Sequence, residues 1–278
     1  MGTSGMRGGL RQALAEHWPE YLIEAAGLGA FMLVACAFGT LLGHPASPVV
    51  QAVPSPHARR ALMGVAMGGT AIALIYSPWG ARSGAHFNPA TTLAFWRLGK
   101  IASADALCYA VAQAAGGSLG VLAAAALLGP ALAAPDVRYV ATLPGEARPL
   151  VAFLAEAAIA FGLMSAVLAA SNAARVARFT GIFAGALVAA YITVEAPLSG
   201  MSMNPARSLA SALPAGAWPE LWIYFTAPPL GMLAAAELYV RRRGVAAVLC
   251  AKLHHHTAQR CIFRCRYALL TPARGARP

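Results

Sequence analysis

The sequence predicts an all-α membrane protein with six transmembrane helices and two shorter re-entrant half-helices. Of its 278 residues, 59% are hydrophobic and only 11% are charged, whereas a soluble domain carries about 25% charged residues. The tripeptide Asn-Pro-Ala occurs twice, in the frames SGAHFNPA at 83–90 and SGMSMNPA at 199–206. The apolar stretches predict the membrane spans, and the repeated motifs predict the half-helices.

Six apolar stretches are long enough to cross a bilayer, which takes about 20 helical residues. We place the spans at 21–43, 61–79, 103–128, 149–171, 180–197 and 218–240. They divide the chain into an N-terminal segment (1–20), a channel domain (21–240) and a basic tail (241–278). The N-terminal segment lacks the apolar core of a signal peptide, so we expect no cleavage there.

Each Asn-Pro-Ala motif has the features of a helix start. Asn is a favoured N-cap, and Pro at the next position already has the φ angle of the first turn. The motifs consist of Asn88, Pro89 and Ala90, and of Asn204, Pro205 and Ala206. The apolar runs that follow them are too short to span a bilayer. We therefore predict one half-helix after the second span and another after the fifth.

The two halves of the channel domain, 21–128 and 149–240, repeat each other. EAAGLGAFMLVA at 24–35 resembles EAAIAFGLMSAV at 156–167. Three spans per half is an odd number, so the second half is inverted relative to the first, as in many transport proteins. The half-helices then meet near the midplane, N-terminus to N-terminus. Glu24 and Glu156 occupy matching positions, and we expect these buried carboxylates to bind the backbone N–H groups of the re-entrant loops.

The charges indicate the orientation. An even number of spans puts both termini on one side, together with Arg7, Arg11, Arg82, Arg97, Lys100, Arg175, Arg178 and Arg241 to Arg243. The positive-inside rule makes that side the cytoplasm, although Arg59, Arg60, Arg138 and Arg148 oppose this assignment. We predict a multi-pass protein of the inner cell membrane. The net charge of +11 lies largely beside a membrane exit, so we expect no nucleic-acid partner.

Two converging helix N-termini have a defined chemistry. Each carries unpaired N–H groups and about half a positive charge. In a narrow pore they repel cations, while the amides of Asn88 and Asn204 donate to the oxygen of a passing water and interrupt a proton-conducting chain. Arg207 follows the second motif directly. Because an arginine within a membrane is costly, it is a functional candidate.

At this point the chain resembles the aquaporin family, also called major intrinsic proteins, as a bacterial-type channel. The resemblance covers about 20–240 and rests on SGAHFNPA, SGMSMNPARS, the two glutamates and YAVAQAAGG at 109–117. It implies a homotetramer with one pore per subunit, no cofactor for transport, and a four-residue selectivity filter near the outer mouth. Counted from the motifs, the filter consists of Met67, Ile192, Met201 and Arg207.

This filter determines which substrates are expected. It lacks the fifth-span histidine of strict water channels and the aromatic pair of glycerol facilitators, and it comes closer to nodulin-like plant proteins. The resemblance implies a passive channel for water, with small uncharged solutes as further candidates. A channel for glycerol or metalloid acids is the alternative. A secondary transporter is a weaker one, because the midplane offers no ion-coordinating residues. No nucleophile–base set appears, so we predict no enzymatic activity.

The tail carries a separate candidate site. CAKLHHHTAQRCIFRC at 250–265 contains Cys250, His254, His255, His256, Cys261 and Cys265. Thiols stay reduced in the cytoplasm, and thiolates with imidazoles at short spacing bind zinc or another soft metal. The spacing matches no standard zinc finger. Arginines in the same segment suit anionic lipid headgroups equally well, so both interpretations stay open.

Overall fold

The computed structural model describes residues 3–145 and 148–270, and this part of the chain is helical without any strand. Six of its helices are long and apolar enough to cross a membrane, which confirms the predicted fold class. They are α1 (Thr3–Gly43), α3 (Pro56–Tyr76), α6 (Ser103–Leu128), α8 (Pro149–Ser171), α9 (Thr180–Val194) and α12 (Leu221–Arg243). Helix α9 reaches spanning length together with the turn before it, as Ala177–Val194. The half-helices are α5 (Pro89–Arg97) and α11 (Pro205–Ala215), and each begins at the proline of its motif.

The helix ends differ from the predicted spans where capping decides them. Helix α1 begins at Thr3 and continues through Pro19, so most of the predicted N-terminal segment is part of the first helix. Helix α3 begins at Pro56, because the Ser55 hydroxyl accepts a hydrogen bond from the backbone N–H of Ala58. Short elements connect the long ones: α2 (Pro48–Ala52), α4 (Pro78–Ser83), α7 (Pro130–Ala133), α10 (Ala196–Ser199), and the 3₁₀ turns η1 (Arg138–Val140), η2 (Ala177–Phe179), η3 (Val245–Ala247) and η4 (Tyr267–Leu270).

The long helices pack in three main pairs, α1 with α6, α8 with α12, and α3 with α9. The first two pairs are equivalent in the inverted repeat. In each of them a glycine lies against the residue that follows the repeated glutamate. A Cβ atom on Gly116 would lie 2.0 Å from the Ala25 oxygen, and one on Gly231 would lie 2.2 Å from the Ala157 oxygen. Glycine therefore permits the close approach of these helix backbones.

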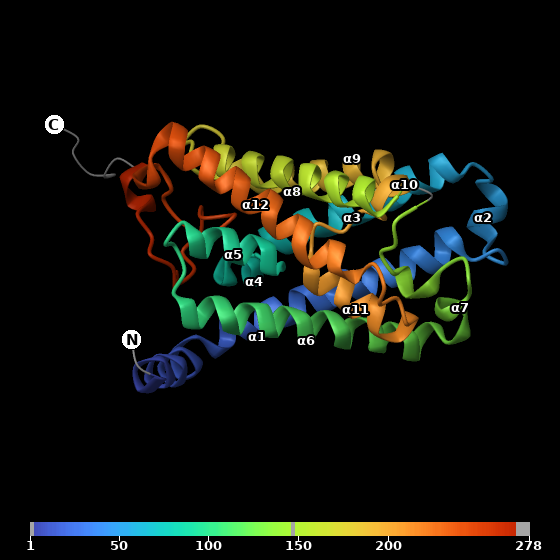
Figure 1. Cartoon of the computed structure of the whole chain (residues 1–278), viewed down its shortest axis with the longest axis horizontal. Helices are drawn as coiled ribbons and strands as arrows, with labels where there is room; N and C mark the ends of the chain where they lie inside the picture. Colours follow the sequence, from blue (N-terminus) through green and yellow to red (C-terminus); the bar gives the residue numbers. More distant parts are fainter. Residues whose placement is uncertain (1–2, 146–147, 271–278) are drawn as a thin grey trace.

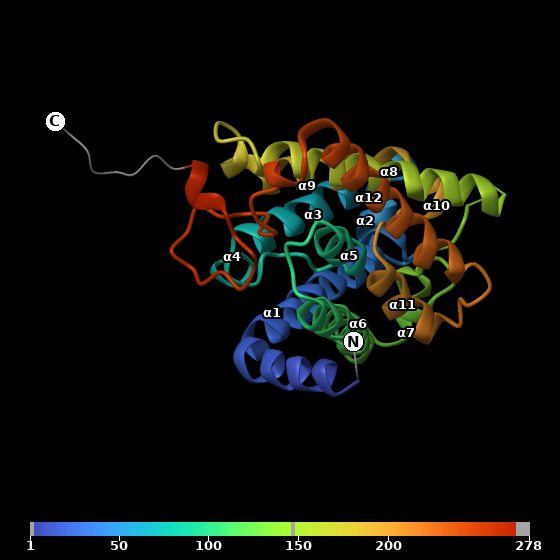
Figure 2. The ribbon, with the colours of Figure 1, turned by 60° about the vertical axis from the view of Figure 1, so that its left-hand side comes forward.

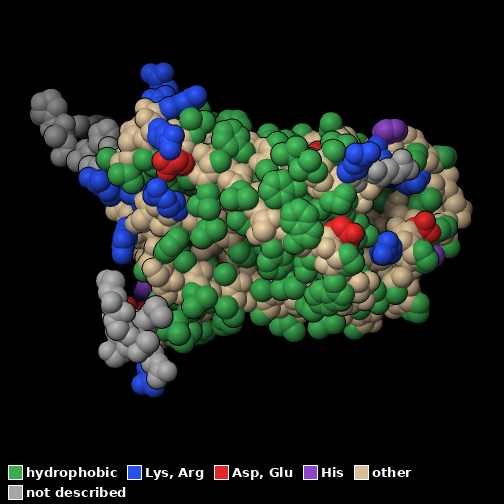
Figure 3. Space-filling view, viewed as in Figure 1, with side chains coloured by type: hydrophobic (Ala, Val, Ile, Leu, Met, Phe, Trp, Pro, Cys, Tyr) green, Lys and Arg blue, Asp and Glu red, His purple; other side chains and the backbone are tan. Residues whose placement is uncertain are grey.

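The half-helices lie inside the bundle of long helices (Figures 1 and 2). The start of α1 and the chain after α12 lie at one end of the molecule, here called the tail end. Helices α2 and α7 lie at the other end, here called the far end. Figure 3 shows a surface that is largely hydrophobic across its middle, with Lys and Arg gathered toward the two ends. Such a distribution is expected of a protein that crosses a bilayer.

The chain after α12 folds back onto the tail end of the bundle. Cys250, Ala251, Lys252 and Leu253 are buried there, and Phe263 belongs to the largest core cluster. The sequence alone predicted a tail that binds metal or lies on lipid headgroups. Contact with headgroups remains a prediction for the exposed Arg264 and Arg266.

Candidate functional site

The two Asn-Pro-Ala motifs meet in the centre of the molecule through reciprocal hydrogen bonds. The Asn88 side-chain nitrogen donates to the Met203 carbonyl at 2.7 Å, and the Asn204 side-chain nitrogen donates to the Phe87 carbonyl at 2.8 Å. Each acceptor directly precedes the other asparagine. An amide nitrogen carries two N–H groups, so each asparagine keeps a second donor at a cavity that both residues line.

The same asparagines cap the half-helices. Asn88 Oδ1 accepts from the N–H of Ala90 at 2.8 Å. Asn204 Oδ1 accepts from the N–H groups of Ala206 at 3.1 Å and Arg207 at 3.2 Å. The side-chain oxygen thus satisfies first-turn donors, while the side-chain nitrogen ties the two loops together. The positive ends of both half-helices therefore converge on one place.

The two loops share an unusual backbone conformation. Positive φ angles occur at matching distances before each asparagine, at Gly84 (96°), Ala85 (58°) and Phe87 (46°), and at Gly200 (81°), Met201 (50°) and Met203 (54°). Residues other than glycine rarely adopt this conformation and do so at a cost in energy. Its presence at equivalent positions of two loops means that the surrounding structure imposes it.

Glu24 and Glu156 hold these loops. Glu24 accepts hydrogen bonds from the N–H groups of His86 (3.1 Å) and Phe87 (2.6 Å). Glu156 accepts from the N–H groups of Ser202 (2.6 Å) and Met203 (2.7 Å). Both carboxylates are fully buried. A buried acceptor needs donors, and a loop without regular structure has free N–H groups, so each pair satisfies both partners.

Sequence reasoning missed several residues that complete this support. The hydroxyls of Ser83 and Ser199 donate to Glu24 and Glu156 at 2.7 and 2.8 Å. Tyr109 and Tyr224 donate to the carbonyls of the same two serines. The sequence does contain a signal for these residues. Both serines belong to the repeated Ser-Gly, and each tyrosine precedes a glycine at a helix crossing, Gly116 or Gly231, by the same interval.

A cavity of about 270 Å³ passes the motifs. Along α3 its wall extends from Arg60 at the far end to Ile75 at the tail end, at intervals that belong to one helix face. The four residues predicted for the filter, Met67, Ile192, Met201 and Arg207, all line this cavity, as do both asparagines. The wall also includes residues that no sequence motif marks, namely Arg60, Met63, Leu163 and Val167.

Arg207 is the charged group closest to the motifs in the sequence. Its Nη1 atom is buried and has no hydrogen-bond partner in the part of the chain that the structure describes. The carboxylate of Glu195, at the end of α9, is also buried, and among the described residues it forms no ion pair with Arg207. A guanidinium with a free donor at the cavity wall can bind the oxygen of a neutral solute and repel a cation.

The structure assembles only part of the predicted metal set in the tail. One ligand atom from each of Cys250, His255, Cys261 and Cys265 lies within 4.8 Å of the others. His254 packs edge-on against Tyr76 at 4.7 Å, and the ring nitrogens of His256 lie 3.3 Å from the Tyr267 hydroxyl. Of the three histidines, His255 therefore lies with the cysteines, while the neighbours of His254 and His256 direct their rings elsewhere. Metal binding at this cluster stays a prediction.

The sequence was also compared with known proteins. The family model described as Major intrinsic protein matches residues 12–239. Aquaporin NIP3-1 of Zea mays is 38% identical over 176 residues, which is 63% of this chain but only 57% of that protein. Aquaporin NIP1-4 of Oryza sativa subsp. japonica is 35% identical, with 83% of this chain and 76% of that protein covered. Aquaporin TIP4-4 of Zea mays is 34% identical, with coverage of 84% and 86%.

The fold has a counterpart among solved structures. The aquaglyceroporin from Plasmodium falciparum superimposes with a TM-score of 0.66 and 18% sequence identity, covering 80% of this chain and 94% of that chain. At this identity the likeness concerns the fold alone. The sequence relatives named above are plant aquaporins, so they support the family and give no support to the predicted bacterial type.

Proposed function

The chain belongs to the major intrinsic protein family, and from this we propose that it is a passive transmembrane channel that conducts water and small uncharged solutes and excludes protons and ions. The observation that carries the proposal is the reciprocal pair of hydrogen bonds between the motifs, from Asn88 to Met203 and from Asn204 to Phe87. These bonds hold the two half-helix N-termini together at one cavity that both asparagines line.

Exclusion of protons follows from the remaining amide donors. A water between Asn88 and Asn204 accepts from both side chains and so cannot accept a proton from the next water in the file. The two half-helix dipoles add a positive potential at the same point. Neutral molecules do not meet this electrostatic barrier. The asparagines are therefore the proposed barrier, and Met67, Ile192, Met201 and Arg207 are the proposed filter.

The lining favours a channel over an ion-coupled transporter. Among the described residues that form the cavity, none is an aspartate or a glutamate. Ion-coupled transporters commonly place coordinating groups near the midplane. Most of the lining is apolar, with Met63, Met67, Met201 and Met203 on it. Because methionine adapts its shape, solutes of the size of glycerol or a metalloid acid are a second candidate cargo.

Location and assembly are part of the same proposal. We place the protein in the inner cell membrane with its tail end on the cytoplasmic side. This orientation follows from Arg241, Arg242 and Arg243, which lie at that end of α12. The proposed functional unit is a homotetramer with one pore in each subunit, as membership of the family suggests. We propose neither a cofactor for transport nor an enzymatic activity.

Stopped-flow light scattering on proteoliposomes tests the conduction of water and solutes. Vesicles with the purified chain should shrink faster than protein-free vesicles in an impermeant osmolyte, with a low activation energy. A second measurement in a glycerol gradient shows whether the re-swelling phase also becomes faster. Water flux equal to that of protein-free vesicles, from protein that is folded and inserted, would refute the proposal.

A further inference from the structure

The segment 249–267, here called the tail cap, forms part of the pore wall at the tail end. The N–H of Leu253 donates to the Gly84 carbonyl at 3.1 Å, and a His86 ring nitrogen lies 2.9 Å from the Ala251 carbonyl. Leu253 lines the same cavity as Ala85 and His86. The tail cap therefore contacts the loop that leads to the first Asn-Pro-Ala motif, and one of its side chains borders the permeation path.

Packing and hydrogen bonds seat the tail cap on the bundle. The Phe263 ring stacks on His86 with 5.4 Å between the ring centroids. The N–H of Leu249 donates to Asn172 Oδ1 at 2.7 Å, and the N–H of Arg264 donates to the Lys100 carbonyl at 3.0 Å. Within the described residues, however, the cap has no regular structure except the turn η4 at its end. Its conformation therefore depends on these contacts with the bundle and on contacts between its own side chains.

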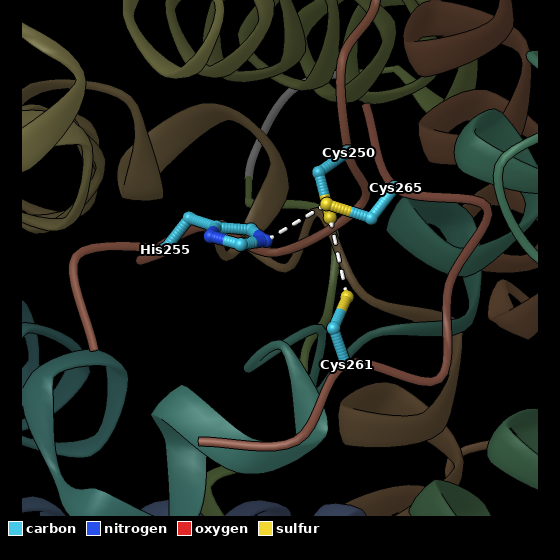
Figure 4. Close-up of side chains that lie close together, drawn as sticks. All are labelled: Cys250, His255, Cys261 and Cys265. Carbon is cyan, nitrogen blue, oxygen red and sulfur yellow. Dashed lines mark hydrogen bonds between the residues drawn. The ribbon is translucent and has the colours of Figure 1, made fainter. Parts of the chain in front are cut away.

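A cluster of four side chains joins the two ends of the tail cap (Figure 4). Cys250 Sγ lies 3.6 Å from Cys261 Sγ, and His255 Nε2 lies 3.0 Å from Cys265 Sγ. A tetrahedral zinc ion with Zn–S bonds of about 2.3 Å places its sulfur ligands about 3.8 Å apart. The four ligand atoms lie within 4.8 Å of one another. Small side-chain adjustments are enough to place a metal ion between them.

A positively charged side chain of the tail cap, Lys252, lies near the cluster. The positive charge of Lys252 acts on Cys261 of this cluster. Lys252 Nζ also donates to the carbonyls of Gln259 and Arg260, which holds the ammonium group inside the cap. A divalent ion with three thiolates and one neutral imidazole carries one net negative charge, and Lys252 offsets it.

We propose that Cys250, His255, Cys261 and Cys265 bind one divalent ion of the zinc class and that the bound ion holds the tail cap across the tail-end mouth of the pore. The metal-loaded protein then conducts less water than the metal-free protein. On binding, each thiol releases its proton to the solvent, and no oxidant takes part. The second half of the proposal rests on the proposed function as a channel, whereas the first half does not.

Metal binding is measured on the untagged full-length protein in detergent, with Zn²⁺ as the probe. Metal stoichiometry by mass spectrometry and competition with a chromogenic chelator should give one ion per chain. Cys261→Ser and His255→Asn should lower the affinity by about tenfold or more, since removal of a ligand costs at least as much as removal of its supporting partner. The matched control is His256→Asn, an adjacent histidine outside the cluster, which should bind as the unchanged protein does.

Two outcomes would overturn the metal site. One is equal affinity in Cys261→Ser and the unchanged protein. The other is a Cys250–Cys261 disulfide in protein purified without a reductant or an oxidant, detected by thiol counting and by the mass of the linked peptide.

The proposed closure of the pore mouth by the metal-loaded tail cap is tested by water flux in proteoliposomes, first with Zn²⁺ and then with a chelator. Chelation should raise the flux of the unchanged protein and of His256→Asn, and should have no effect on Cys261→Ser. Leu253→Ala removes a side chain from the cavity wall without touching the cluster, so it should raise the flux of the loaded protein while its metal stoichiometry stays the same. Equal water flux with and without bound zinc would refute the proposal that the tail cap closes the pore mouth. No flux in any condition would refute the channel and leave the binding result standing.

Discussion

At the residue scale, the proposed function rests on a few side chains with free donors. Arg207 has a buried Nη1 without a partner in the described part of the chain, beside a cavity lined mostly by apolar groups. An unpaired buried guanidinium destabilises a fold unless something else benefits from it. Arg207 lines the cavity, and in the proposed channel its fixed charge acts on the permeating solute.

Replacing Arg207 with Val should loosen selectivity. The variant removes a fixed positive charge from the cavity wall, so water flux persists while leakage of protons or cations increases. The measurement is dye-reported internal pH in proteoliposomes under an imposed pH gradient. Arg241→Val, a change at an exposed arginine, serves as the control and should show no leak. Unchanged selectivity in folded Arg207→Val would make this arginine structural.

Replacing Met67 or Met201 with Ala should widen the filter. Both side chains are nearly fully buried and line the cavity, so truncation leaves space at the wall and raises permeability to solutes of the size of glycerol. Re-swelling rates in a glycerol gradient measure this. Leu62→Ala, on the same helix as Met67 but exposed, should leave the rate unchanged. If both methionine variants behave like Leu62→Ala, the filter lies elsewhere.

The site could be read from the sequence where a motif repeats, and not where contacts come from distant segments. Both asparagines and both glutamates occur in duplicated frames, so symmetry alone related them. Arg60, by contrast, has no repeat partner in a motif, and the sequence marks it only as a charge that opposes the positive-inside rule. In the structure it lines the far end of the cavity. Leu253 reaches the cavity through a fold of the tail cap that no sequence pattern predicts.

At the element scale, the re-entrant loops depend on carboxylates from neighbouring helices. Replacing Glu156 with Gln leaves one acceptor oxygen for the N–H groups of Ser202 and Met203. The unsatisfied donor should cost about 1–3 kcal/mol. We expect a lower melting temperature in detergent and a lower water flux, and Glu24→Gln should behave in the same way because it is the repeat equivalent. Glu237→Gln, at an exposed ion pair, is the control, and equal melting of all three variants would contradict the loop-supporting role.

The crossing of α3 and α9 offers a second test with adjacent positions. A Cβ atom on Gly68 would lie 2.4 Å from the Gly185 carbonyl, whereas one on Gly69 would meet nothing within 4 Å. Gly68→Ala should therefore force the helices apart and cost about 1–3 kcal/mol. Gly69→Ala should be neutral or slightly stabilising, since alanine is the better helix former. Melting curves of both proteins measure the difference, and a loss in both or in neither would mean that close packing does not decide stability here.

The helices were largely predictable from the sequence, and their ends were not. Apolar length identified all six spans, because a bilayer imposes that length. The ends follow local capping and packing instead. Because Ser55 caps the helix, α3 begins at Pro56, before the predicted start of the span at residue 61. Helix α9 ends at Val194, and the separate short helix α10 follows at Ala196–Ser199. Hydropathy does not detect such contacts.

At the scale of the whole molecule, the inverted repeat produces the pore. Two halves of similar sequence pack α1 against α6 and α8 against α12, and each contributes one half-helix to the centre. The amide nitrogen of each motif asparagine donates to a carbonyl in the loop of the other half. Neither half therefore supplies this acceptor for its own asparagine. The proposed proton barrier therefore needs both halves of the chain.

The most direct test of this account measures water and proton flux on the same proteoliposomes. Stopped-flow light scattering gives the water permeability, and a trapped pH-sensitive dye gives the rate at which an imposed pH gradient collapses. Because the motif amides interrupt the chain of waters, we expect fast water flux with proton leakage no greater than in protein-free vesicles. Proton flux that rises together with water flux in the unchanged protein would contradict the central claim.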